Sequence, residues 1–170
     1  AFGLLSWTDL LGWETATVDP ASGTDVSEHY FEDSAAGVFT DADWYAYNLQ
    51  GTHQLYPNYR VYLINTAPGQ ETAREYAMQV IGYYGGDGGT ASGYPSLRWI
   101  DRSAPQAPMS LQVDASSSET WVYLSLASGE VLEIDDATAE TSMDWDIALR
   151  RYEIKLNGGS SGPGTVAGYL

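Results

Sequence analysis

The stretch formed by residues 145–164 reads WDIALRRYEIKLNGGSSGPG, and it indicates the fold more clearly than any other part of the chain. Apolar residues alternate with polar ones through most of it, which is typical of a strand with one buried face. They fall on odd positions before Arg150-Arg151 and on even positions after this pair. A single inserted residue, that is a β-bulge, would bring both apolar sets to one face and aim an arginine. For the arginines themselves, the preferred interpretation is that they simply pair with some of the many carboxylates.

Further strands are predicted upstream of this stretch. Residues 121–126 read WVYLSL and lead into a Ser128-Gly129-Glu130 turn. Residues 60–66 and 76–84 also have strand periodicity, so we expect them to form a hairpin. A fourth strand is expected at 94–100, after a loop with five glycines. This loop lacks the motif that leads into a phosphate-binding helix, so we interpret it as a β-connection.

The composition favours one all-β domain. A chain of 170 residues with 44% hydrophobic residues can bury a substantial core. Its aromatic residues are mostly tyrosine (13) and tryptophan (6), types that are enriched in strands. We therefore predict a single antiparallel β-rich domain. There is no cysteine, so disulfides, thiolate metal sites and cysteine nucleophiles are excluded.

The charge argues against two classes of partner. Acidic residues number 23 and Lys plus Arg only 7, which gives a formal net charge of −16. Such a surface repels nucleic acid and anionic lipid headgroups. The sequence contains no apolar run of eighteen residues, so we expect no membrane-spanning helix. The simplest interpretation of the charge is solubility or residence in a salty medium, and the alternative is a field that attracts cations.

Two of these segments together resemble a known family. In the HmuY-like family of secreted haem-binding proteins, a WxYxSxxxGE hairpin precedes a WDxAxxRYxxxxNGGxSG strand and loop. Residues 121–130 and 145–162 are similar to these two motifs, which form the opening half of the family pattern. The resemblance implies an all-β HmuY-like domain that is located outside the cell or on its surface and is not an enzyme.

The halves of the family pattern occur here in reversed order. Residues 1–102 resemble the closing half, with the similarity in segments such as 44–48 and 59–69, and residues 109–170 resemble the opening half. Between them, residues 103–108 contain two prolines and are interpreted as a linker. Three accounts stay open: circular permutation, one period of a tandem array, or completion of the fold by strand exchange with a neighbour.

The resemblance implies reversible haem or porphyrin binding through axial His or Met ligands. We predict His29 and His53 as the ligands that hold the metal, and Tyr30, Trp44 and Tyr47 as aromatic residues that cover the porphyrin. The thioether candidates are Met78, Met109 and Met143. Met78 has strand periodicity and is expected to fill the core.

Other functions find less support in the sequence. Acidic residues at 25–33 and 135–136 lack a calcium-loop pattern, so they are interpreted as solvated. Only two histidines could act as a general base, which argues against a hydrolase. The alternative to haem binding is a structural subunit of an extracellular or cell-surface assembly or filament, built by head-to-tail strand exchange without haem. The reversed halves and the apolar residues at both ends of the sequence motivate this second prediction.

Overall fold

The computed structural model describes Gly23 and residues 37–170. These residues form eleven strands and two helices of four residues, α2 (Val38–Asp41) and α3 (Asp136–Ala139). The strands are β1 (Tyr45–Tyr47), β2 (Leu55–Pro57), β3 (Tyr62–Asn65), β4 (Glu75–Gly85), β5 (Ala91–Asp101), β6 (Met109–Gln112), β7 (Val122–Ser125), β8 (Glu130–Leu132), β9 (Ile147–Arg150), β10 (Glu153–Leu156) and β11 (Ala167–Tyr169). No helix in this part of the chain is long or apolar enough to cross a membrane.

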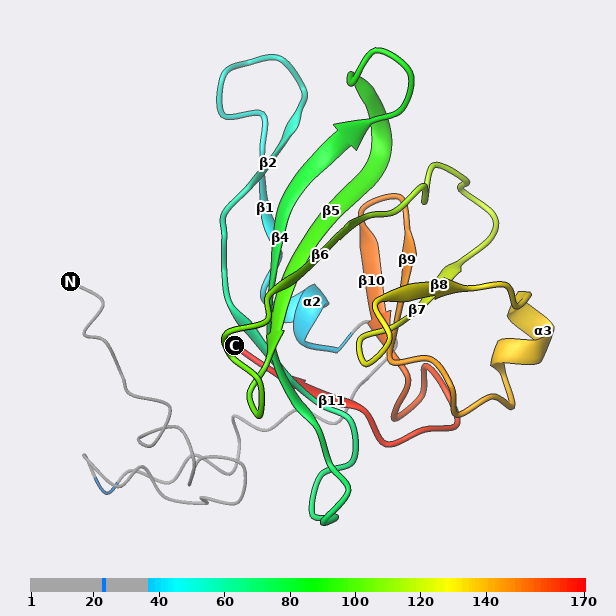
Figure 1. Ribbon diagram of the computed structural model, residues 1–170. Coiled ribbons are helices and arrows are strands. Elements are labelled where there is room, and N and C mark those ends of the chain that lie inside the picture. The colour runs from blue at the N-terminus through cyan, green and yellow to red at the C-terminus, as the bar shows by residue number, and fades with distance from the viewer. Residues whose placement is uncertain (1–22, 24–36) are drawn as a thin grey trace.

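The strands form three antiparallel sheets, which confirms the predicted all-β domain (Figure 1). The largest sheet has the order β11-β3-β4-β5-β6, and a four-stranded sheet has the order β10-β9-β7-β8. Strands β1 and β2 form a separate hairpin. The predicted hairpin of β3 and β4 is present, and β5 covers the strand expected at 94–100.

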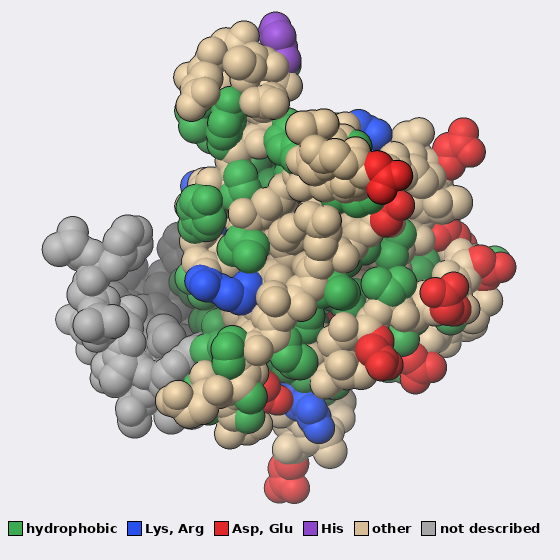
Figure 2. All heavy atoms as spheres, turned by 45° about the horizontal axis from the view of Figure 1, so that its top comes forward, with side chains coloured by type: hydrophobic (Ala, Val, Ile, Leu, Met, Phe, Trp, Pro, Cys, Tyr) green, Lys and Arg blue, Asp and Glu red, His purple; other side chains and the backbone are tan. Residues whose placement is uncertain are grey.

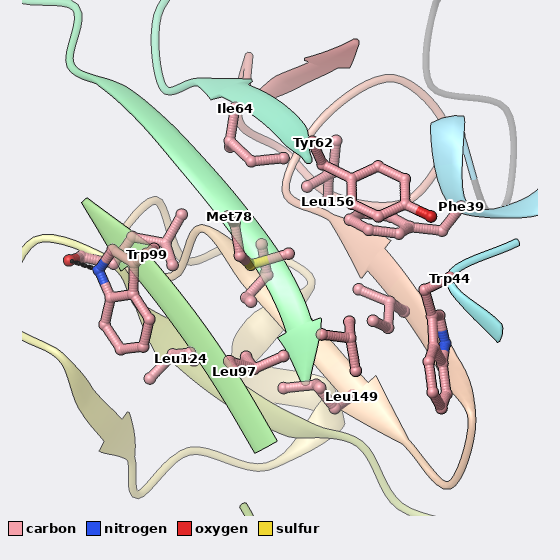
Figure 3. Close-up of a cluster of buried hydrophobic side chains, with 14 of the residues drawn as sticks. Phe39, Trp44, Tyr62, Ile64, Met78, Leu97, Trp99, Leu124, Leu149 and Leu156 are labelled. Carbon is pink, nitrogen blue, oxygen red and sulfur yellow. Dashed lines mark hydrogen bonds between the residues drawn. The ribbon is translucent and has the colours of Figure 1, made fainter. Parts of the chain in front are cut away.

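One hydrophobic core joins the two larger sheets (Figure 3). Alternate residues of β4 are buried, as the pleat of a strand with one inward face requires. Met78 is 0% exposed and packs in this core, so the prediction that it fills the core is confirmed. Leu97 and Trp99 of β5 are buried on the same face, opposite Leu124 and Leu149 of the second sheet.

The two sequence blocks are interleaved within one chain. Strands β3, β4 and β5 precede residue 103, whereas β6 and β11 follow residue 108, and these two strands form the outer edges of the five-stranded sheet. Residues 103–108 connect β5 to β6, which pair with each other. Strands from both blocks therefore contribute to one sheet and to the core that it shares with the second sheet.

The predicted bulge at Arg150-Arg151 is wrong. Strands β9 and β10 form a hairpin whose two-residue loop is Arg151-Tyr152. Leu149 is paired with Ile154, and Ile147 with Leu156, so an odd position on one strand faces the same side as an even position on the other. The hairpin thus explains why the apolar residues change from odd to even positions along the sequence, which we attributed to an inserted residue. Irregular register occurs instead in β4, between Val80 and Tyr84.

The two arginines of this hairpin have different partners. Arg150 pairs with Glu153, with 2.8 Å between Nη2 and Oε2, as expected for an arginine that meets a nearby carboxylate. Arg151 instead donates from Nη1 to the Ser116 carbonyl at 3.1 Å and from Nη2 to the Ser92 hydroxyl at 3.1 Å. Its guanidinium therefore connects the β9–β10 loop to β5 and to the segment that follows β6.

Candidate functional site

His53 lies in the loop that joins β1 to β2. In the space-filling view it projects from the end of the molecule, beyond the body of the two sheets (Figure 2). Residues 48–54 form this loop, and the last pair of the ladder below it is Tyr47 opposite Leu55. The hairpin therefore carries the predicted ligand on an exposed tip.

Hydrogen bonds within the loop hold it in a defined shape. The amide of Asn48 donates to the Gln54 carbonyl at 2.8 Å, and the amide of Gly51 donates to the Asn48 carbonyl at 3.1 Å. The side-chain oxygen of Asn48 accepts from the His53 amide at 2.8 Å. Together these bonds close the loop around Asn48.

Two residues of this loop have unusual backbone conformations. Asn48 has φ of 60° and His53 has φ of 55°, both in the left-handed region. Asparagine and histidine are among the non-glycine residues found most often in this region, and Tyr59 and Arg151 of this chain also adopt it. The two conformations therefore belong to the tight turn of the loop and assign no chemical role to the side chains.

The imidazole of His53 is paired with a tyrosine. The hydroxyl of Tyr47 lies 2.7 Å from Nδ1, and the two ring centroids are 6.0 Å apart. Tyr47 is 56% exposed, and Nε2 of His53 makes none of the hydrogen bonds found in the described part of the chain. The pair therefore presents Nε2 to solvent while the other ring nitrogen is held.

The base of the hairpin is anchored in the core. Trp44 is 2% exposed, and its Nε1 donates to the Tyr152 carbonyl at 2.9 Å. The amide of Leu55 donates to the Tyr84 hydroxyl at 2.9 Å, next to the irregular register of β4. These contacts attach β1 and β2 to both larger sheets and place the loop at a fixed position.

The structure brings together only part of the predicted site. Tyr47 and His53 are in contact, whereas Trp44 is buried at the base of the hairpin and packs against Tyr83. His29 and Tyr30 lie outside the described residues, so their predicted roles stay predictions. Asn48 was not predicted, although asparagine between a strand and a glycine is a known signal for the left-handed conformation.

The methionines have separate environments. Met109 is half-buried beside Trp99 and Gly129, and Met143 is 63% exposed after α3.

Residues 37–170 contain no group of three His, Cys, Asp or Glu side chains that could hold a metal ion. A haem iron takes axial donors such as an imidazole nitrogen, and His53 is the one histidine in the described part of the chain. These residues therefore offer one candidate axial donor, which lies on an exposed loop.

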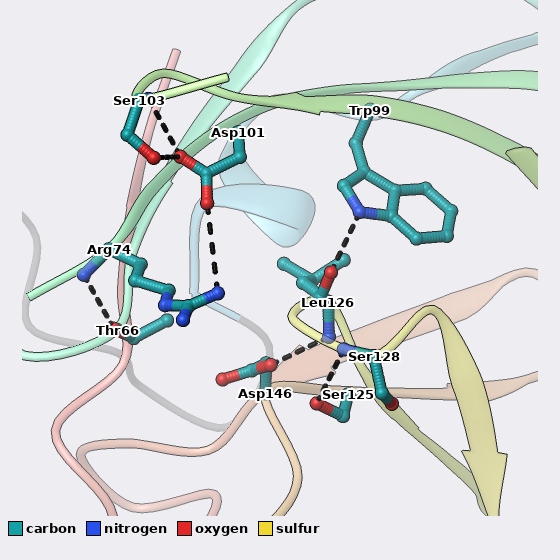
Figure 4. Close-up of polar contacts among 9 residues, drawn as sticks. All are labelled: Thr66, Arg74, Trp99, Asp101, Ser103, Ser125, Leu126, Ser128 and Asp146. Carbon is teal, nitrogen blue, oxygen red and sulfur yellow. Dashed lines mark hydrogen bonds and ion pairs between the residues drawn. The ribbon is translucent and has the colours of Figure 1, made fainter. Parts of the chain in front are cut away.

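A second polar group lies between the two larger sheets (Figure 4). The carboxylate of Asp146 accepts from the Leu126 amide at 2.7 Å, and the Leu126 carbonyl accepts from Nε1 of Trp99 at 3.0 Å. Arg74 lies 3.8 Å from Asp101 on the same side. This network joins the turn after β7 to the start of β9 and to β5, so we assign it a structural role.

We expect Asp146→Asn to remove a pH-dependent loss of stability. Burial raises the pKa of the Asp146 carboxyl above its ordinary value, although the Leu126 and Ala127 amides and Arg74 act to lower it. The folded state then holds this proton more tightly than the unfolded state, so the contribution is complete below about pH 3.9 and is lost as the pH rises through the folded pKa. Asparagine cannot ionise.

Urea unfolding of both proteins across acidic and neutral pH checks this expectation. The free energy of unfolding of Asp146→Asn, relative to that of the wild type, should increase as the pH rises. Altered hydrogen bonds add a difference between the two proteins that does not depend on pH. Two stability curves that stay parallel over the whole range would contradict it.

The motif residues around β7 have packing partners. The ammonium of Lys155, the only lysine of the chain, lies 4.6 Å from the Trp121 ring centroid and 5.4 Å from that of Trp145. The hydroxyl of Tyr123 donates to Asp136 at 3.0 Å, and Asp135 caps α3 by accepting from the Thr138 amide. Both aspartates thus have partners within the fold.

Comparison with known families gives one match. The model of the HmuY protein family matches residues 117–168, which are less than a third of the chain. Residues 117–168 are therefore similar to this family. No curated protein and no solved structure matches it. None of the five predicted site residues lies within the matched segment, which contains the packing motifs described above.

Proposed function

We propose that this protein is an extracellular, non-enzymatic haem- or porphyrin-binding protein of the HmuY-like type. The observation that carries the proposal is the exposed His53, whose Nδ1 is in contact with the Tyr47 hydroxyl. The family match supports the same ligand class, because the HmuY-like family comprises secreted haem-binding proteins.

In this proposal the hairpin tip holds one face of the ligand. A bound haem would supply the iron, and His53 would donate its Nε2 lone pair to one axial position. Tyr47 lies beside that ring and could cover part of the porphyrin. The second axial position is assigned to His29, as the sequence predicts.

His53→Ala is expected to weaken ferric haem binding and to shift the Soret band, because an axial donor is lost. Absorption titration of the native protein and the variant measures both effects. Leu49→Ala is a matched control, since Leu49 belongs to the same loop, is 67% exposed and has no donor atom in its side chain. If His53→Ala binds haem with the wild-type spectrum and affinity, this site assignment fails.

The second candidate function is a structural subunit of an extracellular assembly. The observation in its favour is that the five-stranded sheet ends in two short edge strands, β6 and β11, and that Tyr169 and Leu170 at one edge are exposed. Unpaired strand edges can accept a strand from another chain. Light scattering combined with absorption separates the candidates: a monomer near 18.5 kDa with a Soret band supports the carrier, whereas a large colourless particle supports the subunit.

A further inference from the structure

We propose that residues 2–13 of this chain dock on the outer face of the five-stranded sheet, along an apolar row formed by Tyr169, Leu63, Ala77 and Ile100. The row is an interaction surface that points away from the core, and its occupant is a segment of the same molecule. The β1–β2 hairpin takes no part in this contact, so the docking is independent of haem binding.

The row follows from the register of the sheet. Leu63 of β3 is paired with Tyr169 of β11 on one side and with Ala77 of β4 on the other, and Ala77 is paired with Ile100 of β5. These strands are neighbours in the order β11-β3-β4-β5 (Figure 1). Residues that are paired across a sheet point to the same face, so the four apolar side chains form one continuous row.

This face is opposite to the one that packs in the core. The strand neighbours Tyr62, Met78 and Trp99 are buried in the core, and successive residues of a strand point to opposite faces, so the row points outward. None of its four members belongs to either hydrophobic cluster of the described residues. The three inner members of the row are half-buried, and Tyr169 is 36% exposed.

Polar side chains border the row on both sides. Two residues before Ala77 on β4, Glu75 pairs with Arg102. Two residues after Ala77, the side-chain oxygen of Gln79 accepts from Nη2 of Arg98 at 2.6 Å. An apolar surface with a polar rim is typical of an interaction site.

The chain supplies a segment that matches this surface. Residues 2–13 read FGLLSWTDLLGW and contain seven large apolar residues and one charged residue, Asp9. Neighbouring strands are about 4.8 Å apart, so a row across four strands spans roughly 14 Å. Twelve residues cover about 18 Å even at the rise of a helix, so the segment is long enough to cover the row. Contact between the two removes apolar surface of both from water, which favours docking.

The chain that follows this segment reaches the sheet beside the row. Helix α2 begins at Val38, whose Cγ1 lies 2.8 Å from the position of a Cβ at Gly168, the residue before Tyr169. Residues 14–36 therefore connect the segment to a point next to β11. A connection of 23 residues spans up to about 80 Å, which is several times the length of the row. The tether gives the segment a high effective concentration at this face.

The charge of the protein favours this occupant over a second copy. Each copy has a formal net charge of −16, so two sheets that approach face to face repel each other. Residues 2–13 bring a single carboxylate to the row. The segment therefore covers the apolar surface with less electrostatic cost than a second molecule.

Hydroxyl-radical footprinting of the full chain without haem tests the docking through Trp7 and Trp13, whose oxidation rates report how well water reaches their rings. We expect both to react several-fold more slowly in the native protein than in the urea-unfolded chain. Leu63→Asp should raise both rates several-fold, because a charge is costly to bury in an apolar contact. Ser110→Asp is the matched control, since it adds the same carboxylate to the same face at an exposed position outside the row, and it should leave both rates unchanged.

The buried Trp44 and Trp99 report in the same run whether the core stays closed. If Leu63→Asp opens the core, Leu63→Thr takes its place as a milder polar substitution that suits a strand. Oxidation of Trp7 and Trp13 at the unfolded rate in the wild type overturns the proposal. An equal rise in Ser110→Asp, or no rise in the Leu63 variant with a closed core, also overturns it. Protection that increases with protein concentration, together with a mass above 18.5 kDa, would assign the row to a second copy instead.

Discussion

Asn157→Ala is expected to lower the free energy of unfolding by about 3 kcal/mol or more, since three buried or partly buried backbone groups lose their partner at a cost of at least about 1 kcal/mol each. The side-chain amide of Asn157 donates to the Trp145 carbonyl at 2.8 Å and to the Ser142 carbonyl at 3.1 Å. Its oxygen accepts from the Gly164 amide at 3.0 Å. With 1% exposure, Asn157 lies where water cannot replace these bonds.

The matched control is Asn58→Ala. Asn58 is exposed, donates to the Asp43 carbonyl at 2.7 Å and accepts from the Arg60 amide at 3.2 Å. Water can satisfy the groups that this substitution frees, so we expect a change of less than about 1 kcal/mol. Urea unfolding measures both effects, and an unchanged slope identifies a change in stability alone. Equal midpoints for the two variants would show that the Asn157 network contributes little.

The same network explains the glycines that follow Asn157. A Cβ at Gly162 would lie 2.3 Å from the Asn157 side-chain oxygen and 2.7 Å from Cζ2 of Trp145. A Cβ at Gly158 would lie 2.3 Å from the Val166 carbonyl oxygen. Two glycines of the NGGxSG pattern therefore lie where the chain packs too closely for a side chain, one against Val166 and the other against the buried Asn157. The matched family segment thus carries residues that determine the fold, and the candidate ligand-binding residues lie elsewhere.

The strands could be predicted from the sequence, but the hairpin of β9 and β10 could not. A bulge and a two-residue turn both shift the apolar residues from odd to even positions. The alternation of apolar residues therefore does not distinguish a bulged strand from a hairpin. Arg151 occupies the first loop position with φ of 54°, where glycine is usual, and the turn therefore carried no glycine signal. Its hydrogen bonds to Ser116 and Ser92, which are distant in sequence, hold it there.

The candidate site was predictable by residue type and only partly by position. His53 was selected because the chain has only two histidines, whereas Tyr47 is one of 13 tyrosines and was chosen for its nearness in sequence. The ligand-binding roles of both residues stay predictions. Trp44 has the right chemistry, but the sequence does not show that its indole is buried against Tyr83. The contact of Tyr47 with His53 depends on the loop conformation set by Asn48, which follows from hydrogen bonds rather than from periodicity.

Gly168→Val is expected to destabilise the fold by about 2 to 3 kcal/mol, because it forces a side chain into a packed interior. Gly168 of β11 is paired with Ile64 of β3. A Cβ there would lie 2.8 Å from Cδ1 of Leu156 and 2.8 Å from Cγ1 of Val38. The strand that closes one edge of the large sheet therefore docks through a position that only glycine fits.

Ala167→Val is the control, because it places the same side chain on the same strand with the opposite orientation. A β-branched residue suits a half-buried strand position, so we expect a change of less than about 1 kcal/mol. Urea unfolding and light scattering of both variants test whether β11 packs on its own chain. A large effect of Gly168→Val alone supports the intramolecular edge strand. Equal stability of the two variants would mean that β11 is not docked there, and a wild-type mass above that of a monomer would then favour strand exchange.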